Sequence, residues 1–266
     1  MAIHIGCGSW ADAEYVGVLY PEGLPAKDRL RVYAERFDRV EVNSSYYATP
    51  TLKTVAAWVE QTPPGFIFDL KLHRAFSQSP RKTAEGDLAK RLLEAVQPLV
   101  EAKKLGAFLL TLAPFFGPGR HALDELDGVV EKLRPHPLAV ELRHRAWVDD
   151  GAMVATLDYF RSRDLTWVAL DLPRAEATEL LPPIDEVTNP KLAYLRLHGR
   201  NPGYTEAKTA AERHDYDYPA KELREIAARI QDLAAKAKDV HVSVNNHAND
   251  YAPKAGLALR QLLGQT

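Results

Sequence analysis

Three side chains that could do chemistry follow one short apolar run of the sequence. The run is residues 138–140, and Glu141, Arg143 and His144 come directly after it. A carboxylate, a guanidinium and an imidazole are costly to bury in an apolar core, so we expect them at the mouth of a site. Such a set can transfer protons and bind an anion.

The same order, an apolar run with a polar end, recurs along the chain. Further cases are VEVN at 40–43, FDLKLH at 68–73, LRLHGR at 195–200 and VSVNNH at 242–247. In a parallel barrel the C-terminal ends of all strands meet at one face. We therefore expect these polar side chains to converge on one pocket.

Two glutamates are the predicted acid–base pair. Glu41 and Glu141 each end an apolar run, where burial or a nearby guanidinium can shift the pKa of a carboxyl group. His198 is predicted to orient the substrate or to carry a proton. The alternative is that both carboxylates only pair with neighbouring cations and order the barrel mouth.

The other polar ends make the expected pocket cationic. Planar guanidinium groups suit phosphate or carboxylate groups, so the predicted partner is an anionic small-molecule substrate. The predicted substrate-binding residues are Trp10, Asn43, Lys71, His73, Arg143, Arg196, Arg200, Tyr204, Asn245 and Asn246. Structural ion pairing is the alternative for each cation, and loop packing is the alternative for the aromatic residues.

We predict neither a metal site nor a cofactor. His73, His198 and His247 could bind a metal with acidic strand ends, but they lack helical metal-binding spacing and nearby cations would compete. A metal-dependent phosphodiesterase or nucleic-acid-processing barrel stays as the second hypothesis, and a non-catalytic binding or regulatory protein as the third. Cys7, the only cysteine, is predicted to be a buried apolar residue rather than a nucleophile.

Alternating strand and helix patterns predict the elements that carry these residues. The predicted strands are residues 3–7, 39–42, 66–70, 107–112, 138–140, 166–170, 192–197 and 240–244. This order predicts a (β/α)8 TIM-type barrel, with residues 1–266 forming a single domain. An open doubly wound sheet is the alternative, and the lack of a glycine-rich phosphate turn after the first strand disfavours it.

Helical patterns and loops complete the predicted fold. Apolar spacing predicts helices at residues 28–37, 51–61 and 121–133. A later helix is expected to bury Val154, Leu157 and Phe160, and residues 77–86 are expected to form a polar loop.

The long segment from 198 to 218 is predicted to be a lid over the pocket. It starts on pocket residues, contains the turn signal NPG at 201–203 and has no clear core face. We expect Tyr204 or Tyr216 to reach toward the pocket when the lid closes. The alternative is a static loop packed on the barrel rim.

The composition of the chain limits its expected partners and its expected location in the cell. The chain has 266 residues and a formal net charge of −2, which does not favour a nucleic-acid partner. A single cysteine suits a reducing compartment, the start does not resemble a signal peptide, and no apolar stretch is long enough for a membrane span. We expect a cytoplasmic protein with no membrane partner, and the oligomeric state is left open.

Several blocks of the sequence resemble the domain-of-unknown-function 72 family. They are IGCGSW at 5–10, LYP at 19–21, VEVNSSYY at 40–47, Lys71, VELRH at 140–144, RLHGR at 196–200 and NN at 245–246. The resemblance runs from the first predicted strand to the last and implies a TIM-type barrel, but it implies no settled activity. Thr111 stands where many members have glutamine, which removes an amide from the expected pocket.

Overall fold

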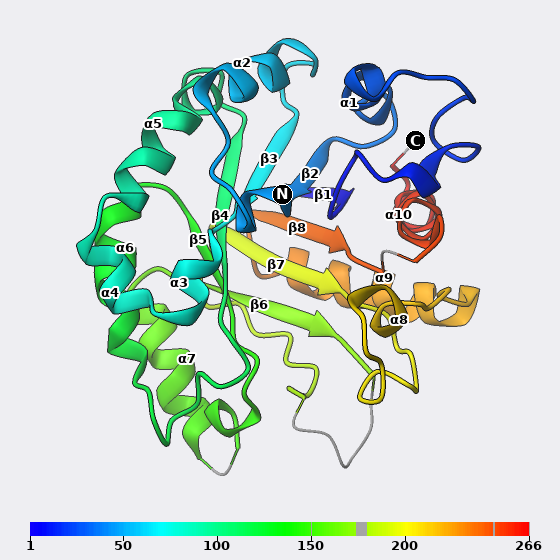
Figure 1. Ribbon diagram of the computed structural model, residues 1–266. Coiled ribbons are helices and arrows are strands. Elements are labelled where there is room, and N and C mark those ends of the chain that lie inside the picture. Colours follow the sequence, from blue (N-terminus) through cyan, green and yellow to red (C-terminus); the bar gives the residue numbers. More distant parts are fainter. Residues whose placement is uncertain (150, 174–179, 247, 266) are drawn as a thin grey trace.

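The computed structural model describes residues 1–149, 151–173, 180–246 and 248–265, in which eight parallel strands curve into a nearly closed barrel (Figure 1). The strands are β1 (Ala2–Cys7), β2 (Arg39–Val42), β3 (Ile67–Lys71), β4 (Leu105–Thr111), β5 (Leu138–Glu141), β6 (Thr166–Asp171), β7 (Leu192–Leu197) and β8 (Asp239–Val244). They are hydrogen-bonded in the order β1-β8-β7-β6-β5-β4-β3-β2. The predicted (β/α)8 barrel is confirmed.

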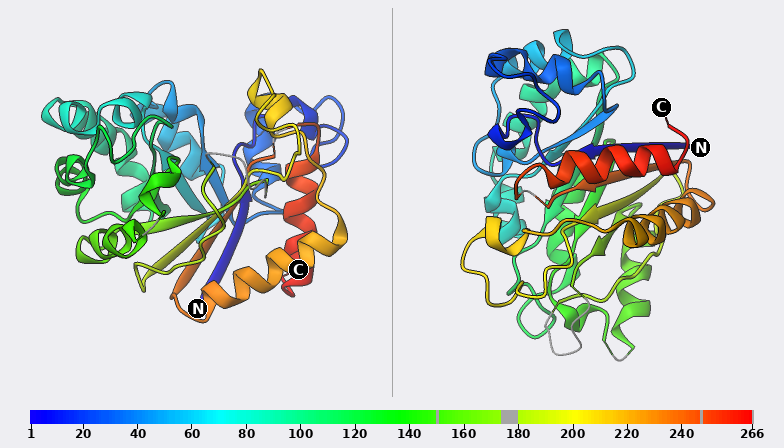
Figure 2. Two further views of the ribbon diagram at one scale, coloured as in Figure 1. Left: turned by 90° about the horizontal axis from the view of Figure 1, so that it is seen from below. Right: turned by 90° about the vertical axis from the view of Figure 1, so that its right-hand side faces the viewer.

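Helices surround the strands on the outside of the barrel (Figure 2). The α-helices are α1 (Arg29–Tyr33), α2 (Leu52–Glu60), α3 (Arg74–Gln78), α4 (Pro80–Glu85), α5 (Leu88–Glu101), α6 (Asp127–Leu133), α7 (Ala152–Ser162), α8 (Ala210–Arg213), α9 (Ala220–Ala234) and α10 (Tyr251–Leu262). Short 3-10 helices occur at Ala13–Tyr15, Ala26–Asp28, Ser44–Tyr46, Leu123–Leu126 and Arg145–Trp147. No helix of the described segments is both long and apolar enough to cross a membrane.

Burial explains why the strands read as apolar runs. Every residue of β2, β5, β6 and β7 is buried, because helices cover the outer face of the sheet and side chains fill the barrel interior. Successive residues therefore face the helices and the interior in turn. Polar side chains that face inward near the C-terminal ends of strands come together at one end of the barrel.

The sheet has a seam between β1 and β2, which lie side by side at its two ends (Figure 1). The backbones approach so closely that a Cβ on Gly6 would lie 1.9 Å from the carbonyl oxygen of Arg39. The Tyr33 hydroxyl accepts a hydrogen bond from the Cys7 amide at 2.7 Å and donates one to the Arg39 carbonyl at 2.9 Å. A side chain thus links strands that share no ladder within the described residues.

Two sequence predictions about local structure are wrong. Residues 77–86 are not a continuous polar loop, because Pro80 occupies the first turn of α4, where its missing N–H costs nothing. Val154 is 65% exposed, since the buried stripe of α7 runs through Thr156, Leu157 and Phe160 and leaves Val154 outside it.

Candidate functional site

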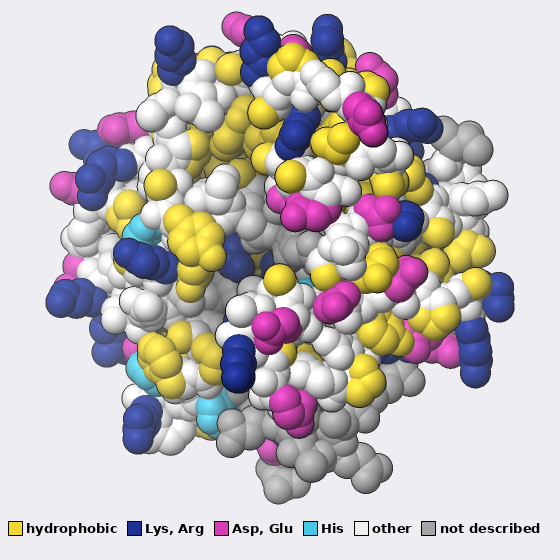
Figure 3. Space-filling view, turned by 45° about the vertical axis from the view of Figure 1, so that its right-hand side comes forward, with side chains coloured by type: hydrophobic (Ala, Val, Ile, Leu, Met, Phe, Trp, Pro, Cys, Tyr) yellow, Lys and Arg dark blue, Asp and Glu magenta, His cyan; other side chains and the backbone are white. Residues whose placement is uncertain are grey.

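A cavity of about 470 Å³ opens at the C-terminal ends of the strands, and we call it the mouth cavity. Its polar walls carry Asn43, Lys71, Thr111, Arg143, Arg196, His198, Arg213, His214 and Asn245. In the view that brings forward the ends of β6, β7 and β8, a recess near the centre contains Lys or Arg side chains (Figure 3). The mouth of the barrel is therefore hollow, polar and rich in cations.

A second cavity of about 420 Å³ adjoins the first, and we call it the leucine cavity. The two cavities share Pro114, Arg143, His198 and Arg213. The other walls of the leucine cavity include Leu170, Leu172, Leu180 and Leu181. A polar space and an apolar space thus lie on either side of the same two arginines.

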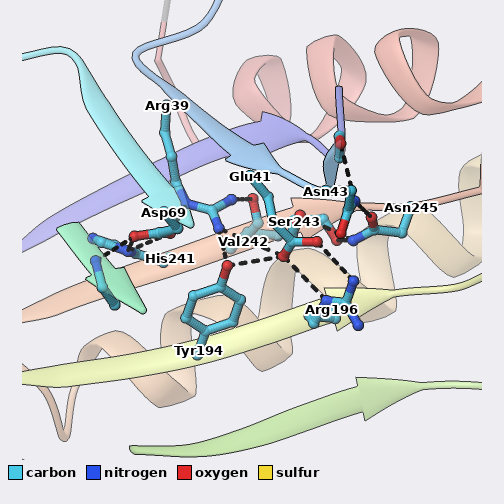
Figure 4. Close-up of polar contacts among 12 residues, drawn as sticks. Arg39, Glu41, Asn43, Asp69, Tyr194, Arg196, His241, Val242, Ser243 and Asn245 are labelled. Carbon is cyan, nitrogen blue, oxygen red and sulfur yellow. Dashed lines mark hydrogen bonds and ion pairs between the residues drawn. The ribbon is translucent and has the colours of Figure 1, made fainter. Parts of the chain in front are cut away.

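Arg196 on β7 is the central cation of the mouth. Its side chain is 2% exposed, and it donates hydrogen bonds to Glu41 on β2 at 2.6 and 3.1 Å. It also donates to Glu141 on β5, whose other oxygen accepts from Arg143 at 2.8 Å. Figure 4 shows the Glu41–Arg196 pair inside the barrel. One guanidinium therefore holds both glutamates that were predicted as the acid–base pair.

These contacts set the charge of both carboxylates. Burial by itself would raise the pKa of Glu41, but the Arg196 guanidinium outweighs it and holds that pKa at about 2. At Glu141, burial by itself would also raise the pKa. Arg196 and Arg143 outweigh it and lower that pKa well below its ordinary value. Both groups stay ionised near neutral pH, which suits counterions better than proton carriers.

Lys71, the last residue of β3, also lines the mouth cavity. Its Nζ atom lies 4.8 Å from the centre of the Tyr46 ring and makes no hydrogen bond or ion pair with a described residue. Burial, followed by repulsion from Arg196, lowers the pKa of Lys71 from 10.5 to about 7. This amine therefore gains and loses a proton near neutral pH.

Three polar atoms of the mouth cavity lack partners. Thr111 Oγ1, His198 Nδ1 and Asn43 Oδ1 are buried without a hydrogen bond to any described residue. A buried polar atom without a partner costs about 1–3 kcal/mol, so such atoms are uncommon in a region that only stabilises a fold. Together they offer hydrogen bonds to a bound molecule.

The state of His198 follows from its neighbours. Burial and the Arg196 cation lower the pKa of His198 to about 4, so the imidazole is neutral at physiological pH. Arg196 Nη1, which can only donate, lies 3.3 Å from His198 Nε2, closer than the Glu141 carboxylate oxygen at 3.6 Å. We therefore assign the proton to Nδ1, the atom without a partner.

The structure brings together most of the residues predicted to form the site. The mouth cavity is lined by Asn43, Lys71, Arg143, Arg196, His198 and Asn245. Glu41 contacts Arg196, while Glu141 and Tyr204 line the leucine cavity.

Trp10 and His73 line neither of these cavities. Trp10 packs edge-on against the rings of Trp58 and Phe68. The His73 side chain accepts a hydrogen bond from the Ala75 amide at 3.2 Å, at the start of α3. Both residues followed the strand-end pattern, but their side chains support neighbouring elements instead of the predicted pocket.

Arg200 and Asn246 also lie outside the two cavities. Arg200 donates to Asp171 at 2.9 Å and to Glu225 at 3.2 Å. The Asn246 amide donates to the carbonyl of Tyr216 at 2.8 Å and so anchors the long loop to the end of β8. These contacts order the rim, and the structure does not bring either side chain to the predicted pocket.

Arg213 is a site residue that the sequence analysis missed. It belongs to the short helix α8 and lies 5.5 Å from the centre of the Tyr204 ring, where it lines both cavities. Tyr204 reaches the leucine cavity as expected of a lid residue, whereas Tyr216 donates to Glu222 at 3.0 Å. No strand-end pattern marks Arg213, because its position depends on how the loop folds back. Closure of the loop stays a prediction.

The candidate metal ligands are dispersed. Within the described residues, no group of three or more His, Cys, Asp or Glu side chains is placed to hold a metal ion. Asp171 pairs with Arg200 and Arg229, and His247 lies outside the described residues. Cys7 is fully buried, and burial raises the pKa of its thiol to about 12, which disfavours a nucleophilic thiolate.

The fold and the mouth cavity define a TIM-type barrel with a polar, cation-rich pocket at the C-terminal ends of its strands. The family model described as "Protein of unknown function DUF72" matches residues 4–266. The chain therefore belongs to the DUF72 family.

Relatives and solved structures agree with this assignment. UPF0759 protein YunF of Bacillus subtilis is 25% identical over 98% of the chain and 94% of the relative. UPF0759 protein YecE of Escherichia coli K12 is 30% identical, over 64% of the chain and 59% of the relative. A DUF72 family protein from Thermotoga maritima has a TM-score of 0.88 and 27% identity, covering 99% of this chain and all of that chain. One from Enterococcus faecalis also has a TM-score of 0.88 and 27% identity, with 99% and 96% covered.

Proposed function

We propose that this protein is an enzyme that uses acid–base chemistry on an anionic small molecule bound in the mouth cavity. Lys71 carries the proposal, because its amine reaches the cavity without a partner among the described residues. Its pKa of about 7 matches the pH at which a proton carrier works best in neutral solution.

The roles of the charged residues differ from the sequence prediction. With the pKa of both glutamates lowered, Glu41 and Glu141 act as counterions that fix Arg196. Lys71 replaces them as the group that exchanges a proton. His198 keeps its predicted orienting role, since its neutral imidazole can donate one hydrogen bond from Nδ1.

The charge of the walls favours an anion. Lys71, Arg143, Arg196 and Arg213 line the mouth cavity, whereas Glu41 and Glu141 balance only part of that charge through Arg196 and Arg143. Positive charge in a partly closed space attracts anions and binds them more strongly than in open water. A volume of about 470 Å³ is in the range of small-molecule sites.

Thermal unfolding with added phosphate tests anion binding. We expect phosphate to raise the melting temperature more than chloride at the same ionic strength, because a ligand that binds only the folded state stabilises it. Arg213→Gln should remove the difference, and Arg36→Gln, at an exposed position away from the mouth, should keep it. Equal shifts in the two salts for the wild-type protein would overturn the anion site.

An activity screen tests the chemistry. Small phosphates and carboxylates are incubated with the wild-type protein and with Lys71→Met, purified in parallel. We expect turnover by the wild type, with a loss of about 100-fold or more in Lys71→Met, as for removal of a general acid or base. Turnover that is equal in both proteins would show that Lys71 carries no proton in the reaction.

A further inference from the structure

We infer that Lys71 is a nucleophile that forms an imine with an anionic aldehyde or ketone in the mouth cavity. The inference rests on the proposed function and names its substrate class, a carbonyl compound that carries a carboxylate or a phosphate group. It assigns covalent chemistry to a group that the proposed function uses only for proton transfer.

The position of Lys71 leaves its nitrogen available for attack. Within the described residues no carboxylate forms an ion pair with Nζ, which lies 4.8 Å from the centre of the Tyr46 ring. The buried Ser45 hydroxyl lies 2.6 Å from both the Lys71 and the Val42 carbonyl oxygens and shares its hydrogen between them, which ties the end of β3 to the end of β2. A lysine without a carboxylate partner, held at the end of a strand, is well placed to present a neutral amine.

The surroundings give Lys71 a large share of neutral amine near pH 7. Burial has the largest effect, and Arg196 and Arg143, both lining the same cavity, repel a further positive charge. The Glu141 and Glu41 carboxylates offset part of this effect. Cationic neighbours of this kind are a known means of activating lysine toward carbonyl groups.

Two unpartnered groups can handle the oxygen and the protons of the reaction. Thr111 and His198 line the cavity and are each 5% exposed, and Thr111 Oγ1 and His198 Nδ1 are buried without a hydrogen-bond partner among the described residues. Both can donate a hydrogen bond to a carbonyl oxygen, and the hydroxyl can also accept one. A carbonyl compound would satisfy groups for which the described residues provide no partner.

The step balances without an oxidant or a reductant. The Nζ lone pair forms a bond to the carbonyl carbon, and the electron pair of the C=O bond moves to oxygen. Oxygen gains a proton and nitrogen loses one, which gives a carbinolamine. A further proton on the hydroxyl lets it leave as water while the nitrogen lone pair forms the C=N bond. Addition of water reverses the sequence and frees Lys71.

The two arginines shared by both cavities give the anionic group its place. Arg143 and Arg213 stand between the mouth cavity and the leucine cavity. A carboxylate or phosphate next to the carbonyl would pair with them while the carbonyl carbon meets Lys71.

Reductive trapping tests the inference on the full-length wild-type protein. Glyoxylate is the anionic aldehyde, cyanoborohydride reduces any imine to a stable amine, and peptide mass spectrometry locates the adduct. We expect labelling of Lys71 at least about tenfold faster than of the exposed Lys53 at neutral pH, because more of the Lys71 amine is neutral. The rate should rise with pH with a midpoint near 7, and added phosphate should slow it.

Variants separate the chemistry from folding and from binding. Lys71→Arg keeps the positive charge and cannot form an imine, so the fast labelling should vanish while phosphate still raises the melting temperature. Lys53→Met should leave the fast labelling unchanged. Uniform slow labelling of all lysines in the wild type would overturn the imine, and if phosphate still stabilised the protein the proposed function would stand. Uniform labelling without any phosphate effect would overturn both.

Discussion

Two cavities of similar size open at opposite ends of the barrel. The cavity at the strand N-termini, which includes Leu105, Leu138 and His241, measures about 480 Å³, and the mouth cavity about 470 Å³. Among the described residues, none that lines the N-terminal cavity has a buried side-chain polar atom without a partner, whereas the mouth cavity has three. The two ends of the barrel therefore do not differ in cavity volume. They differ in the number of buried polar atoms that lack a hydrogen-bond partner.

Two buried arginines show the same difference. Near the N-terminal end, Arg39 donates to Asp69 at 2.6 Å, to the Val242 carbonyl at 2.7 Å and to the Tyr194 hydroxyl (Figure 4). These contacts occupy all of its nitrogens. A buried guanidinium whose nitrogens all have partners stabilises the fold. Stability is the role expected of the N-terminal end of a TIM-type barrel.

Arg196 is equally buried but borders a cavity. Its two carboxylate partners compensate its charge, yet Lys71, Thr111 and His198 beside it keep groups without partners among the described residues. Tyr194 links the two regions, because its hydroxyl accepts from Arg39 and donates to Glu41 at 2.8 Å. A series of hydrogen-bonded polar side chains thus runs through the barrel from Arg39, whose nitrogens all have partners, to Arg196, which borders the mouth cavity.

Removal of Arg39 should give the largest loss of stability. Arg39→Met leaves the Asp69 carboxylate buried with only part of its compensation, so we expect unfolding in urea to cost about 3–5 kcal/mol less than in the wild type. Arg36→Met, at an exposed position, should change the free energy of unfolding by less than about 0.5 kcal/mol. A loss below about 1 kcal/mol for Arg39→Met would show that water reaches Asp69.

Removal of Arg196 should cost less than removal of Arg39. Glu41 and Glu141 keep other donors, Tyr194 and Arg143 respectively, and the mouth cavity admits water. We expect a loss of about 2–3 kcal/mol in the same urea titration. If Arg196→Met proved as destabilising as Arg39→Met, the contrast between a closed and an open end would fail.

The stability of the protein at acidic pH should depend on Glu41. Its folded-state pKa is lowered from 4.5 to about 2, so its stabilising contribution is present above pH 4.5 and is lost as pH falls toward about 2. Glu41→Gln should flatten the dependence of the melting temperature on pH in this range, by the equivalent of about 3 kcal/mol. Glu35→Gln, at an exposed position, serves as the control. Identical slopes for wild type and Glu41→Gln would contradict the ion pair.

The smallest expected effect has the opposite sign. Thr111→Val removes a buried hydroxyl without a partner, so we expect it to raise the free energy of unfolding by about 1 kcal/mol and to weaken phosphate binding. Thr156→Val should instead lower stability by about 1 kcal/mol, because the Thr156 hydroxyl donates to the Trp147 carbonyl at 2.7 Å. Destabilisation by Thr111→Val would mean that its hydroxyl serves the fold.

The sequence predicted the barrel because its signal is repeated. Each strand is an apolar run, and the polar ends of several strands converge at the mouth, as for Lys71, Arg143 and Arg196. The strand-end pattern did not fix where each side chain points. Asn245 and Asn246, which follow β8, are neighbours in the sequence, yet one lines the cavity and the other bonds to the Tyr216 carbonyl.

The protonation states of the charged residues were harder to predict than their positions. Residue types suggested that Glu41 and Glu141 carry protons and that Lys71 binds the anion. The pKa of each depends on which carboxylate Arg196 reaches and on how far each group is buried, and these are properties of the folded chain. Arg213 was missed for a related reason, because a loop without apolar periodicity gives no sign of where it returns.

Side chains, instead of a ladder of backbone hydrogen bonds, hold β1 and β2 together at the seam within the described residues. In a fully closed ladder, hydrogen bonds between every pair of strands fix the perimeter. Here the Tyr33 hydroxyl bridges the backbones of the two strands, and the Asn43 amide bridges the gap at the mouth by donating to the Gly8 carbonyl at 2.9 Å. Asn43 is also part of the cavity wall. A molecule bound against Asn43 would therefore contact one of the side chains that join the first strand to the second.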